Sequence, residues 1–205
     1  MKLIETKNYD ELSRVAADML ISEIKAKPDC VLGLATGSTP IGTYDKLIEA
    51  YKANEVSFAK VKSINLDEYV GISWSNTESY RYFMNEHLFD HVDIDKTNTH
   101  VPNGLAGDLD EECARYDALY DQIGPVDIQV LGIGLNGHIG FNEPGTSLSA
   151  PTHIVKLSDS TRQANSRNFT SLDAVPYKAI TLGMAGIMKA KKIVLLASGP
   201  AKRDA

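Results

Sequence analysis

The chain has 205 residues, of which 43% are hydrophobic, and its formal net charge at pH 7 is −6. This length suits one domain with a sizeable core, so we expect a single domain over residues 1–205. The acidic balance argues against a nucleic-acid partner, and no apolar stretch is long enough to span a bilayer. Two cysteines, Cys30 and Cys113, and the polar N-terminus favour a cytoplasmic protein with unpaired thiols.

Short apolar runs alternate with amphipathic stretches along the whole chain, which is typical of an α/β protein. In chain order we expect a helix at 8–26, a strand at 31–35, a helix at 40–53, a strand at 61–66, helices at 77–90 and 108–123, a strand at 128–131, a helix at 160–169, a weaker strand at 179–182, a helix at 184–190 and a strand at 193–197. The prediction is a largely parallel sheet with helices on both faces, a Rossmann-like three-layer sandwich.

Polar residues follow the expected strands, at the edge where parallel sheets bind ligands. The first strand is followed by small and hydroxyl residues that favour an anion site at a helix start: Thr36, Gly37, Ser38 and Thr39. Asp67 and Glu68 follow the second strand, and Lys202 follows the last. Each feature alone also fits a capping turn, solvated charges or a surface lysine. Together they predict a site where a phosphorylated substrate undergoes proton transfer.

The loop after the third strand carries His138 and Glu143 among several glycines. We expect the carboxylate to orient the imidazole and to raise its pKa, so that the pair can exchange protons with a substrate oxygen. The alternative is an ordinary polar residue in a turn.

We expect neither a cofactor nor a metal. The loop contains Gly132-x-Gly134-x-x-Gly137, with Asp159 at the distance of a ribose-binding acid, but the run 142–145, Asn-Glu-Pro-Gly, breaks the helix that a dinucleotide fingerprint requires. His87 and His91 have a zinc-compatible spacing, yet Leu88 stands where a zinc protease motif has glutamate, so we interpret both as surface histidines.

Three segments resemble the glucosamine-6-phosphate deaminase family: Asn65–Gly71, Gly137–Pro144 and Thr161–Arg167. Their order and separation also fit the family, and the resemblance covers essentially the whole chain. It implies that glucosamine 6-phosphate and water are converted to fructose 6-phosphate and ammonia in amino-sugar catabolism, without a cofactor and with a small sugar phosphate as the only partner.

The resemblance also implies roles for individual residues. Asp67 matches the base that moves a proton from C2 to C1, His138 matches the residue that opens the sugar ring, and Glu143 matches its partner. Asn136 stands where some members have aspartate, and it would support His138 by a hydrogen bond. The phosphate or substrate ligands would be Thr36, Gly37, Ser38, Thr39, Gly137, Arg167 and Lys202. A mobile lid is expected at about 151–175.

Two departures from the family pattern lead to further expectations. Thr152, His153, Ile154 and Val155 replace the basic residues of allosteric members, so we expect a short, non-allosteric bacterial type that is a monomer or low-order homo-oligomer. Family members continue beyond Lys202, so we expect the chain to be truncated at its C-terminus. Two alternatives stay open: a 6-phosphogluconolactonase-type hydrolase, and a non-catalytic sugar-phosphate sensor.

Overall fold

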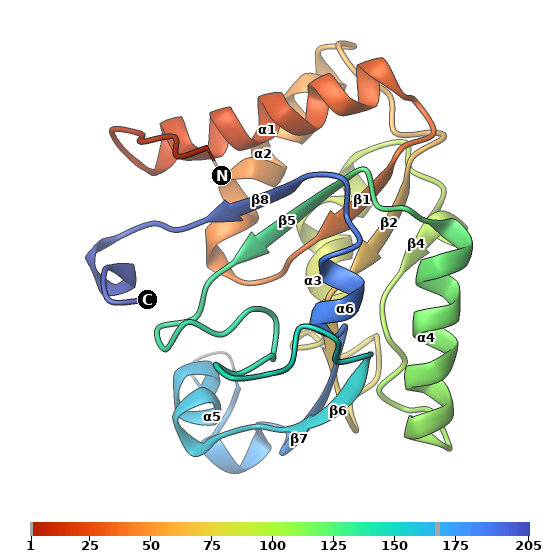
Figure 1. Ribbon diagram of the computed structural model, residues 1–205. Coiled ribbons are helices and arrows are strands. Elements are labelled where there is room, and N and C mark those ends of the chain that lie inside the picture. Colours follow the sequence, from red (N-terminus) through yellow and green to blue (C-terminus); the bar gives the residue numbers. More distant parts are fainter. Residues whose placement is uncertain (1, 167–168) are drawn as a thin grey trace.

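The computed structural model describes residues 2–166 and 169–205. Its main sheet has five strands in the order β4-β2-β1-β5-β8 (Figure 1). The strands are β1 (Val31–Leu34), β2 (Lys62–Asn65), β4 (Thr99–His100), β5 (Ile128–Gly132) and β8 (Ile193–Leu196). Every pair of neighbours runs parallel, with Gly33 opposite both Ile64 and Gln129. The prediction of an α/β fold built on a parallel sheet is confirmed.

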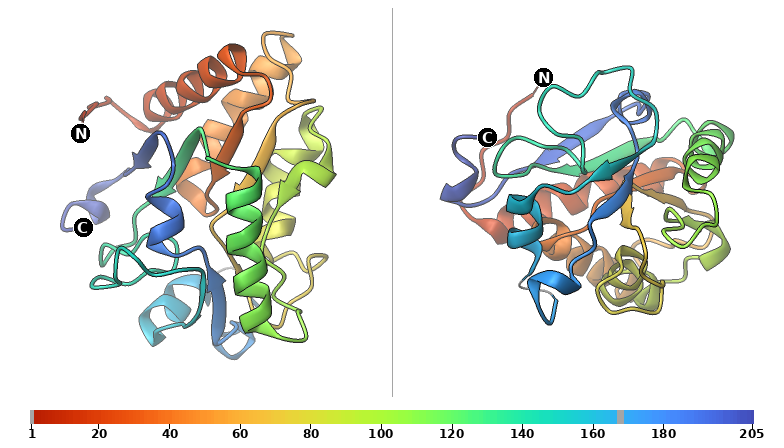
Figure 2. Two further views of the ribbon diagram at one scale, coloured as in Figure 1. Left: turned by 45° about the vertical axis from the view of Figure 1, so that its right-hand side comes forward. Right: turned by 90° about the horizontal axis from the view of Figure 1, so that it is seen from below.

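Helices cover both faces of this sheet, as expected (Figure 2). One face carries α1 (Tyr9–Ala26), α2 (Ser38–Lys52) and α3 (Tyr80–His87), and the other carries α4 (Leu109–Ile123) and α6 (Met184–Ile187). Alternate residues of β1 divide between two cores, because successive side chains of a strand point to opposite faces. Leu32 and Leu34 pack with α1 and α2, whereas Val31 packs with Tyr116 of α4 and Ile187 of α6.

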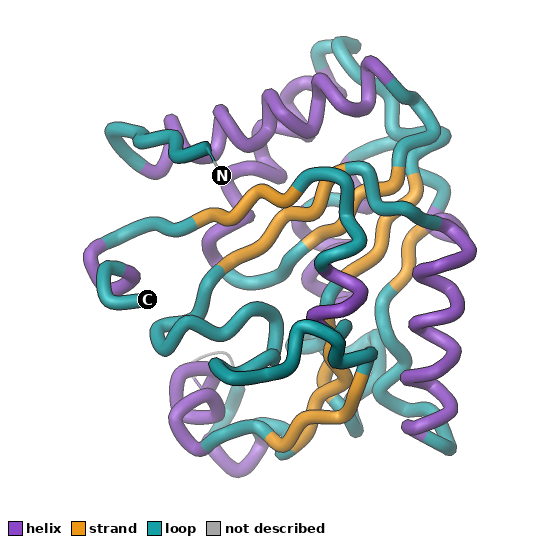
Figure 3. The backbone as a smooth tube through the Cα atoms, in the orientation of Figure 1, coloured by secondary structure: helices purple, strands orange, loops and turns teal. Residues whose placement is uncertain are grey.

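A second, smaller sheet lies beyond the carboxyl ends of the parallel strands (Figure 3). Its strands are β3 (Asp67–Tyr69), β7 (Lys178–Thr181) and β6 (His153–Lys156), paired antiparallel in that order. We expected the strand at 179–182 in a single parallel sheet, whereas β7 belongs to this second sheet. A short apolar run has the same pattern in either sheet, and its pairing is decided by partners distant in the sequence.

The two sheets meet at Leu66, the residue between β2 and β3. The main-chain oxygen of Leu66 accepts a hydrogen bond of 2.6 Å from the Leu182 N–H, and Asp67 pairs with Thr181. The chain therefore leaves the parallel sheet and enters the antiparallel one within a single residue. Asp67 is held between the two sheets at the carboxyl edge.

Several helices are shorter than the sequence pattern predicts. Helix α3 begins at Tyr80 because the Ser79 hydroxyl caps it by accepting a hydrogen bond from the Tyr82 N–H. Helix α5 (Asp159–Asn165) begins after the capping residue Ser158 and ends before the predicted limit at 169. Short 3-10 turns complete the described chain: η1 (Phe89–His91), η2 (Lys96–Asn98), η4 (Leu172–Ala174) and η5 (Pro200–Lys202).

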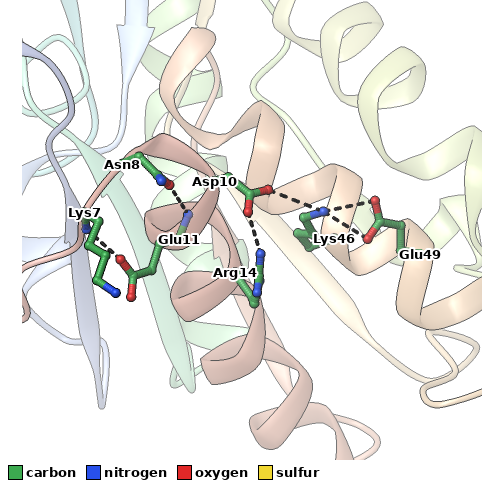
Figure 4. Close-up of polar contacts among 7 residues, drawn as sticks. All are labelled: Lys7, Asn8, Asp10, Glu11, Arg14, Lys46 and Glu49. Atoms are coloured by element: carbon green, nitrogen blue, oxygen red, sulfur yellow. Dashed lines mark hydrogen bonds and ion pairs between the residues drawn. The ribbon is translucent and has the colours of Figure 1, made fainter.

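Polar contacts fix the start of α1 and its position beside α2 (Figure 4). The Asn8 side chain accepts a hydrogen bond of 2.9 Å from the Glu11 N–H, which caps the helix. Asp10 lies between Arg14 of the same helix and Lys46 of α2, whose ammonium is 3.6 Å from one Asp10 oxygen. All of these charged groups are largely exposed except Lys46, so the contacts orient the helices more than they stabilise them.

A buried carboxylate joins several elements at the amino end of the main sheet. Asp127 accepts hydrogen bonds of 2.7 Å from the ammonium groups of Lys27 and Lys191 and one of 2.9 Å from the Val31 N–H. Although burial opposes ionisation, these three donors lower the pKa of Asp127 to about 2. Asp127 therefore connects the end of α1, the start of β1 and the segment before β8.

Candidate active site

A cavity of about 220 Å³ opens at the carboxyl ends of the parallel strands. It collects seven of the residues predicted from the sequence: Thr36, Gly37, Ser38, Thr39, Asp67, His138 and Lys202. Three further side chains from separate elements complete much of the wall: Tyr80, Phe141 and Thr161. No role of these three residues was predicted from the sequence.

The anion-binding expectation concerns the start of α2, which forms one wall of the cavity. Gly37 precedes the helix with a φ of 91°, a conformation that residues with a side chain rarely adopt. In the part of the chain that the structure describes, no side chain caps this helix, so the first main-chain N–H groups of α2 stay available to an acceptor. The positive end of the helix dipole also favours an anion here.

The carboxylate of Asp67 is buried in the cavity wall, with the residue only 6% exposed. Among the described residues, none donates a hydrogen bond to it. Burial therefore raises the pKa of Asp67 to about 8, and the negative charge of Glu68 adds to the effect. Gly140 leaves room for the carboxylate, because an added Cβ would lie 3.3 Å from its Oδ2 atom. This arrangement gives an unusually basic carboxylate.

The neighbouring carboxylate, Glu68, has a different environment. Its oxygens accept hydrogen bonds from the main-chain N–H groups of Tyr69, Tyr80 and Arg81, at 2.9, 2.9 and 3.0 Å. Burial raises the pKa of Glu68 to about 7, although the three donors act in the opposite direction. Glu68 thus anchors the start of α3, and Tyr80 at that start lines the cavity.

His138 and Glu143 are connected through a third side chain. The Oδ1 atom of Asn136 lies 2.6 Å from His138 Nδ1, and Asn136 Nδ2 donates a hydrogen bond of 2.6 Å to Glu143 Oε2. Because an amide oxygen only accepts, Nδ1 carries a proton and Nε2 is left with its lone pair in the neutral ring. The carboxylate therefore acts on the imidazole through the Asn136 amide.

The pKa of His138 differs from our expectation. Burial lowers it, the negative charge of Glu143 raises it and the positive charge of Lys202 lowers it, with a net decrease below the usual value. We expected an increase, but the carboxylate acts only from beyond Asn136, so desolvation outweighs it. A neutral imidazole at physiological pH follows.

Glycines shape the loop around this imidazole. An added Cβ at Gly134 would lie 2.2 Å from His138 Nδ1, so no larger residue can stand there while the ring keeps its place. Gly137 has a φ of 89° and donates its N–H to Gly134 O at 3.1 Å. Gly137 does not line the cavity, and neither do Asn136 and Glu143.

Two cations were predicted to complete the site. Lys202 lies in η5 and lines the cavity, with its ammonium donating to the main-chain oxygen of Ile133 at the end of β5. Arg167 lies outside the described residues. Lys202 therefore comes from the last described turn to the same edge as Asp67 and His138.

Two aromatic rings form a part of the cavity wall that was not predicted from the sequence. Tyr80 and Phe141 line the cavity with nearly parallel rings whose centres are 6.2 Å apart. The ring of Tyr69 packs against both, and Phe169 packs edge-on against Tyr69 with the centres 5.6 Å apart. Tyr69 lies two residues after Asp67 in β3, so the two side chains share one face of the strand. This spacing was the sequence feature that could have indicated an aromatic ring close to Asp67.

The other histidines and the cysteines lie elsewhere. His87 and His91 line a groove of about 410 Å³ between α2 and the α3–η1 segment, with three acidic neighbours: Asp45, Glu49 and Glu86. Within residues 2–166 and 169–205, no cluster of three or more ligating side chains could hold a metal ion.

Cys30 and Cys113 are buried free thiols, and burial raises the pKa of both. No described helix is long and apolar enough to cross a membrane.

Residues 5–205 match the family model of glucosamine-6-phosphate isomerases and 6-phosphogluconolactonases. The chain belongs to this family. It is 57% identical to a glucosamine-6-phosphate deaminase of Geobacillus sp. (strain WCH70) over 98% of this chain and 80% of the relative. It is 58% identical to the deaminase of Clostridium perfringens (strain SM101 / Type A) over 100% of this chain and 84% of the relative.

Solved structures of the family share the fold. A monomeric glucosamine-6-phosphate deaminase superposes with a TM-score of 0.93 at 51% identity, covering 95% of this chain and 81% of that one. The 6-phosphogluconolactonase of Thermotoga maritima superposes with a TM-score of 0.75 at 18% identity, covering 99% of this chain and 85% of that one. The second likeness concerns the fold alone. The family resemblance seen in the sequence is confirmed.

Proposed function

We propose that this protein converts glucosamine 6-phosphate and water to fructose 6-phosphate and ammonia. The observation that carries the proposal is that Asp67 and His138 face one cavity together with the uncapped start of α2 and Lys202. The relatives that are 57% and 58% identical carry the name of this activity, which supports the assignment.

The substrate phosphate binds at the start of α2 in this proposal. The main-chain N–H groups and hydroxyls of Thr36–Thr39 donate to its oxygens, and the Lys202 ammonium balances its charge. Each charge-assisted hydrogen bond of this kind contributes roughly 1.5–3 kcal/mol. Binding at this end directs the sugar carbons toward Asp67 and His138.

His138 opens the pyranose ring: its Nε2 atom accepts the proton of the C1 hydroxyl and delivers it to the ring oxygen as the bond between C1 and that oxygen breaks. The neutral imidazole is ready for this step because its Nδ1 proton is held by Asn136 and its lowered pKa leaves Nε2 free to accept. Glu143 supports the ring indirectly through the Asn136 amide. The open-chain aldehyde then acidifies the proton at C2.

Asp67 transfers this proton between carbons. It removes the C2 proton while a proton of the substrate ammonium group passes to the C1 oxygen, which gives a cis-enolamine, and it then returns its own proton to C1, which leaves an iminium group at C2. Water adds to that carbon, ammonia leaves, and fructose 6-phosphate results. Burial favours this step because it makes the carboxylate more basic, and the positive ammonium group of the substrate favours the ionised form on binding.

The two alternatives receive less support. Solved 6-phosphogluconolactonases are 17–21% identical to the chain, against 51% for the solved deaminase. A non-catalytic sensor would have no use for a carboxylate whose burial raises its pKa to about 8 beside a positioned imidazole. We further propose that the protein acts as a monomer, as its solved relative does, and that it works in the cytoplasm as one domain.

One experiment separates these possibilities. The purified protein is mixed with glucosamine 6-phosphate or with 6-phosphogluconolactone, while ammonia, fructose 6-phosphate and lactone are followed. We expect ammonia and fructose 6-phosphate in equal amounts from the first substrate, with the Asp67→Asn variant as a control for contaminating activity. Loss of lactone without release of ammonia would establish the hydrolase instead, and binding without either reaction would establish the sensor.

A further inference from the structure

Thr161 contributes a hydroxyl to the cavity that the mechanism above does not use. It lies in α5 and lines the same cavity as Asp67 and His138, although the residue is only 9% exposed. Helix α5 lies beyond the carboxyl edge of the main sheet, so this hydroxyl reaches the cavity from an element separate from the start of α2 (Figure 1).

The hydrogen bonds of Thr161 leave its hydroxyl proton available. Ser158 Oγ accepts a hydrogen bond of 3.1 Å from the Thr161 N–H, and the Ser158 hydroxyl donates one of 2.9 Å to Thr161 Oγ1. Thr161 Oγ1 is therefore an acceptor in this contact. No acceptor for its own proton occurs among the hydrogen bonds of the described residues. A buried hydroxyl donor without an acceptor is unfavourable, so a ligand oxygen is its natural partner.

Neighbouring contacts fix the direction of this side chain. Arg162, the next residue of α5, donates from Nη2 to the main-chain oxygens of Leu172 and Val175, at 2.8 and 3.2 Å. Its guanidinium lies 3.8 Å from the ring centre of Tyr177. These contacts join α5 to the 172–177 segment, so that the two keep a fixed arrangement, and the branched Cβ of threonine restricts its own rotation.

We propose that Thr161 binds the substrate by donating a hydrogen bond to an oxygen of the sugar phosphate. This inference rests on the proposed function, which supplies the ligand. A donor on α5 together with the donors at the start of α2 would hold the ligand at two places. Such a pair fixes the orientation of the carbons that face Asp67, because one anchored end still permits rotation.

The test compares Thr161→Val, which removes the hydroxyl but preserves the shape, with Thr161→Ser, which retains the hydroxyl. We expect the valine variant to raise KM for glucosamine 6-phosphate by about 3- to 10-fold, the contribution of one neutral hydrogen bond, and the serine variant to stay near the wild type. Thr43→Val is the matched control, because Thr43 also has a buried hydroxyl without a partner but does not line the cavity.

Ligand-induced shifts in Tm distinguish the two sources of the oxygen. If Thr161 contacts the phosphate, Thr161→Val reduces the shift caused by inorganic phosphate and that caused by fructose 6-phosphate. If it contacts a sugar hydroxyl, only the fructose 6-phosphate shift decreases. Unchanged KM and unchanged shifts in the valine variant would overturn the proposal, and so would a serine variant as impaired as the valine variant.

The experiment also separates this proposal from the proposed function. A wild-type protein that releases no ammonia would contradict the deaminase assignment, while the Tm shifts would still report whether Thr161 binds the ligand. Should Thr161→Val fail to fold, Thr161→Ala provides the same comparison against Thr161→Ser.

Discussion

The Oδ1 atom of Asn136 lies 2.6 Å from the Nδ1 atom of His138, where it fixes the ring tautomer without placing a charge beside it. An aspartate at this position would do both. Because an adjacent carboxylate favours the protonated imidazole, we predict that Asn136→Asp raises the pKa of His138 by about one unit or more. Titration of the His138 ring protons by NMR measures this pKa. An unchanged value would show that burial alone determines it, and Asn136→Ala serves as the uncharged comparison.

The proposed ring-opening role of His138 predicts a defect that depends on the form of the substrate. His138→Gln should slow the reaction of cyclic glucosamine 6-phosphate by about 10²–10⁴-fold, the usual contribution of a positioned acid or base. An open-chain ketose analogue in the reverse direction should be affected much less. Rates for both forms, measured on the same protein preparation, provide the comparison. Equal losses would instead place His138 in the proton-transfer step or in maintenance of the fold.

Asp67→Asn should have opposite effects on activity and on stability. We expect turnover to fall by at least about 10²–10⁴-fold, because an amide cannot accept the C2 proton, while binding of phosphate ligands is retained. Solvent-isotope exchange at C1 would report the loss. Asp45→Asn, which changes an exposed carboxyl of α2, is the control for both effects.

The stability effect follows from the pKa of Asp67, which burial raises from 3.8 to about 8. Below about pH 4 the carboxyl is protonated in both the folded and the unfolded chain, so it does not change the free energy of unfolding. Between pH 4 and 8 the unfolded chain releases the proton more readily, so the wild type loses stability as pH rises and the amide variant does not. We expect the variant to melt higher at pH 8, by about 5 °C or more, and to melt equally at pH 4. The same pKa predicts that kcat/KM of the wild type increases toward pH 8.

The buried Asp127 carboxylate should stabilise the fold against acid. Its pKa of about 2 lies below the 3.8 of an ordinary aspartate, so its contribution is present above pH 4 and is lost as pH falls toward 2. Asp127→Ala removes two ion pairs with half-exposed lysines and leaves the buried Val31 N–H without its acceptor, and we expect a loss of about 2–3 kcal/mol in the free energy of unfolding. Asp121→Ala is the matched control, because it removes an exposed ion pair with Lys189 and should cost less than about 1 kcal/mol. Urea unfolding curves at pH 7 measure both, and similar losses would contradict the prediction.

The lid expected at about 151–175 should be mobile only in part. Its first residues are fixed, because Thr152 donates to Asp117 of α4 and β6 pairs with β7. Val175 at the other end is 1% exposed. We therefore predict that a sugar phosphate slows amide hydrogen exchange in α5 and η4, with little change in β6. Uniformly slow exchange across 151–175 before ligand is added would contradict a lid.

Much of the main sheet could be predicted from the sequence, because its central strands are apolar runs that end in polar residues. Val31–Leu34 and Ile128–Gly132 lie within one or two residues of the expected ranges. The strand Thr99–His100 could not be predicted, since two residues carry no periodicity and its pairing with β2 depends on contacts across the fold. The same reason explains why β7 was expected in the wrong sheet.

The cavity was predicted in part for a similar reason. Polar residues at strand ends were visible as a pattern, and Asp67, His138 and Lys202 do meet in one cavity. Tyr80 and Thr161 lie on short helices whose direction depends on Glu68 and Arg162, and both of these act through main-chain groups distant in sequence. Whether Glu143 touches His138 directly also depended on the path of one loop, which residue order alone does not determine.

The glycine pattern that contains Gly134 occurs in two different structural contexts. In a dinucleotide-binding turn, the absent side chain makes room for a pyrophosphate. Here the vacant space is filled by the chain's own imidazole, with ring atoms 2.2 Å from where a Cβ would stand. The pattern Gly132-x-Gly134-x-x-Gly137 thus seats a histidine instead of a nucleotide. Glycine spacing alone would therefore group this protein with nicotinamide enzymes. The two kinds of loop differ in what fills the space of the absent side chain, which is a pyrophosphate in one and an imidazole in the other.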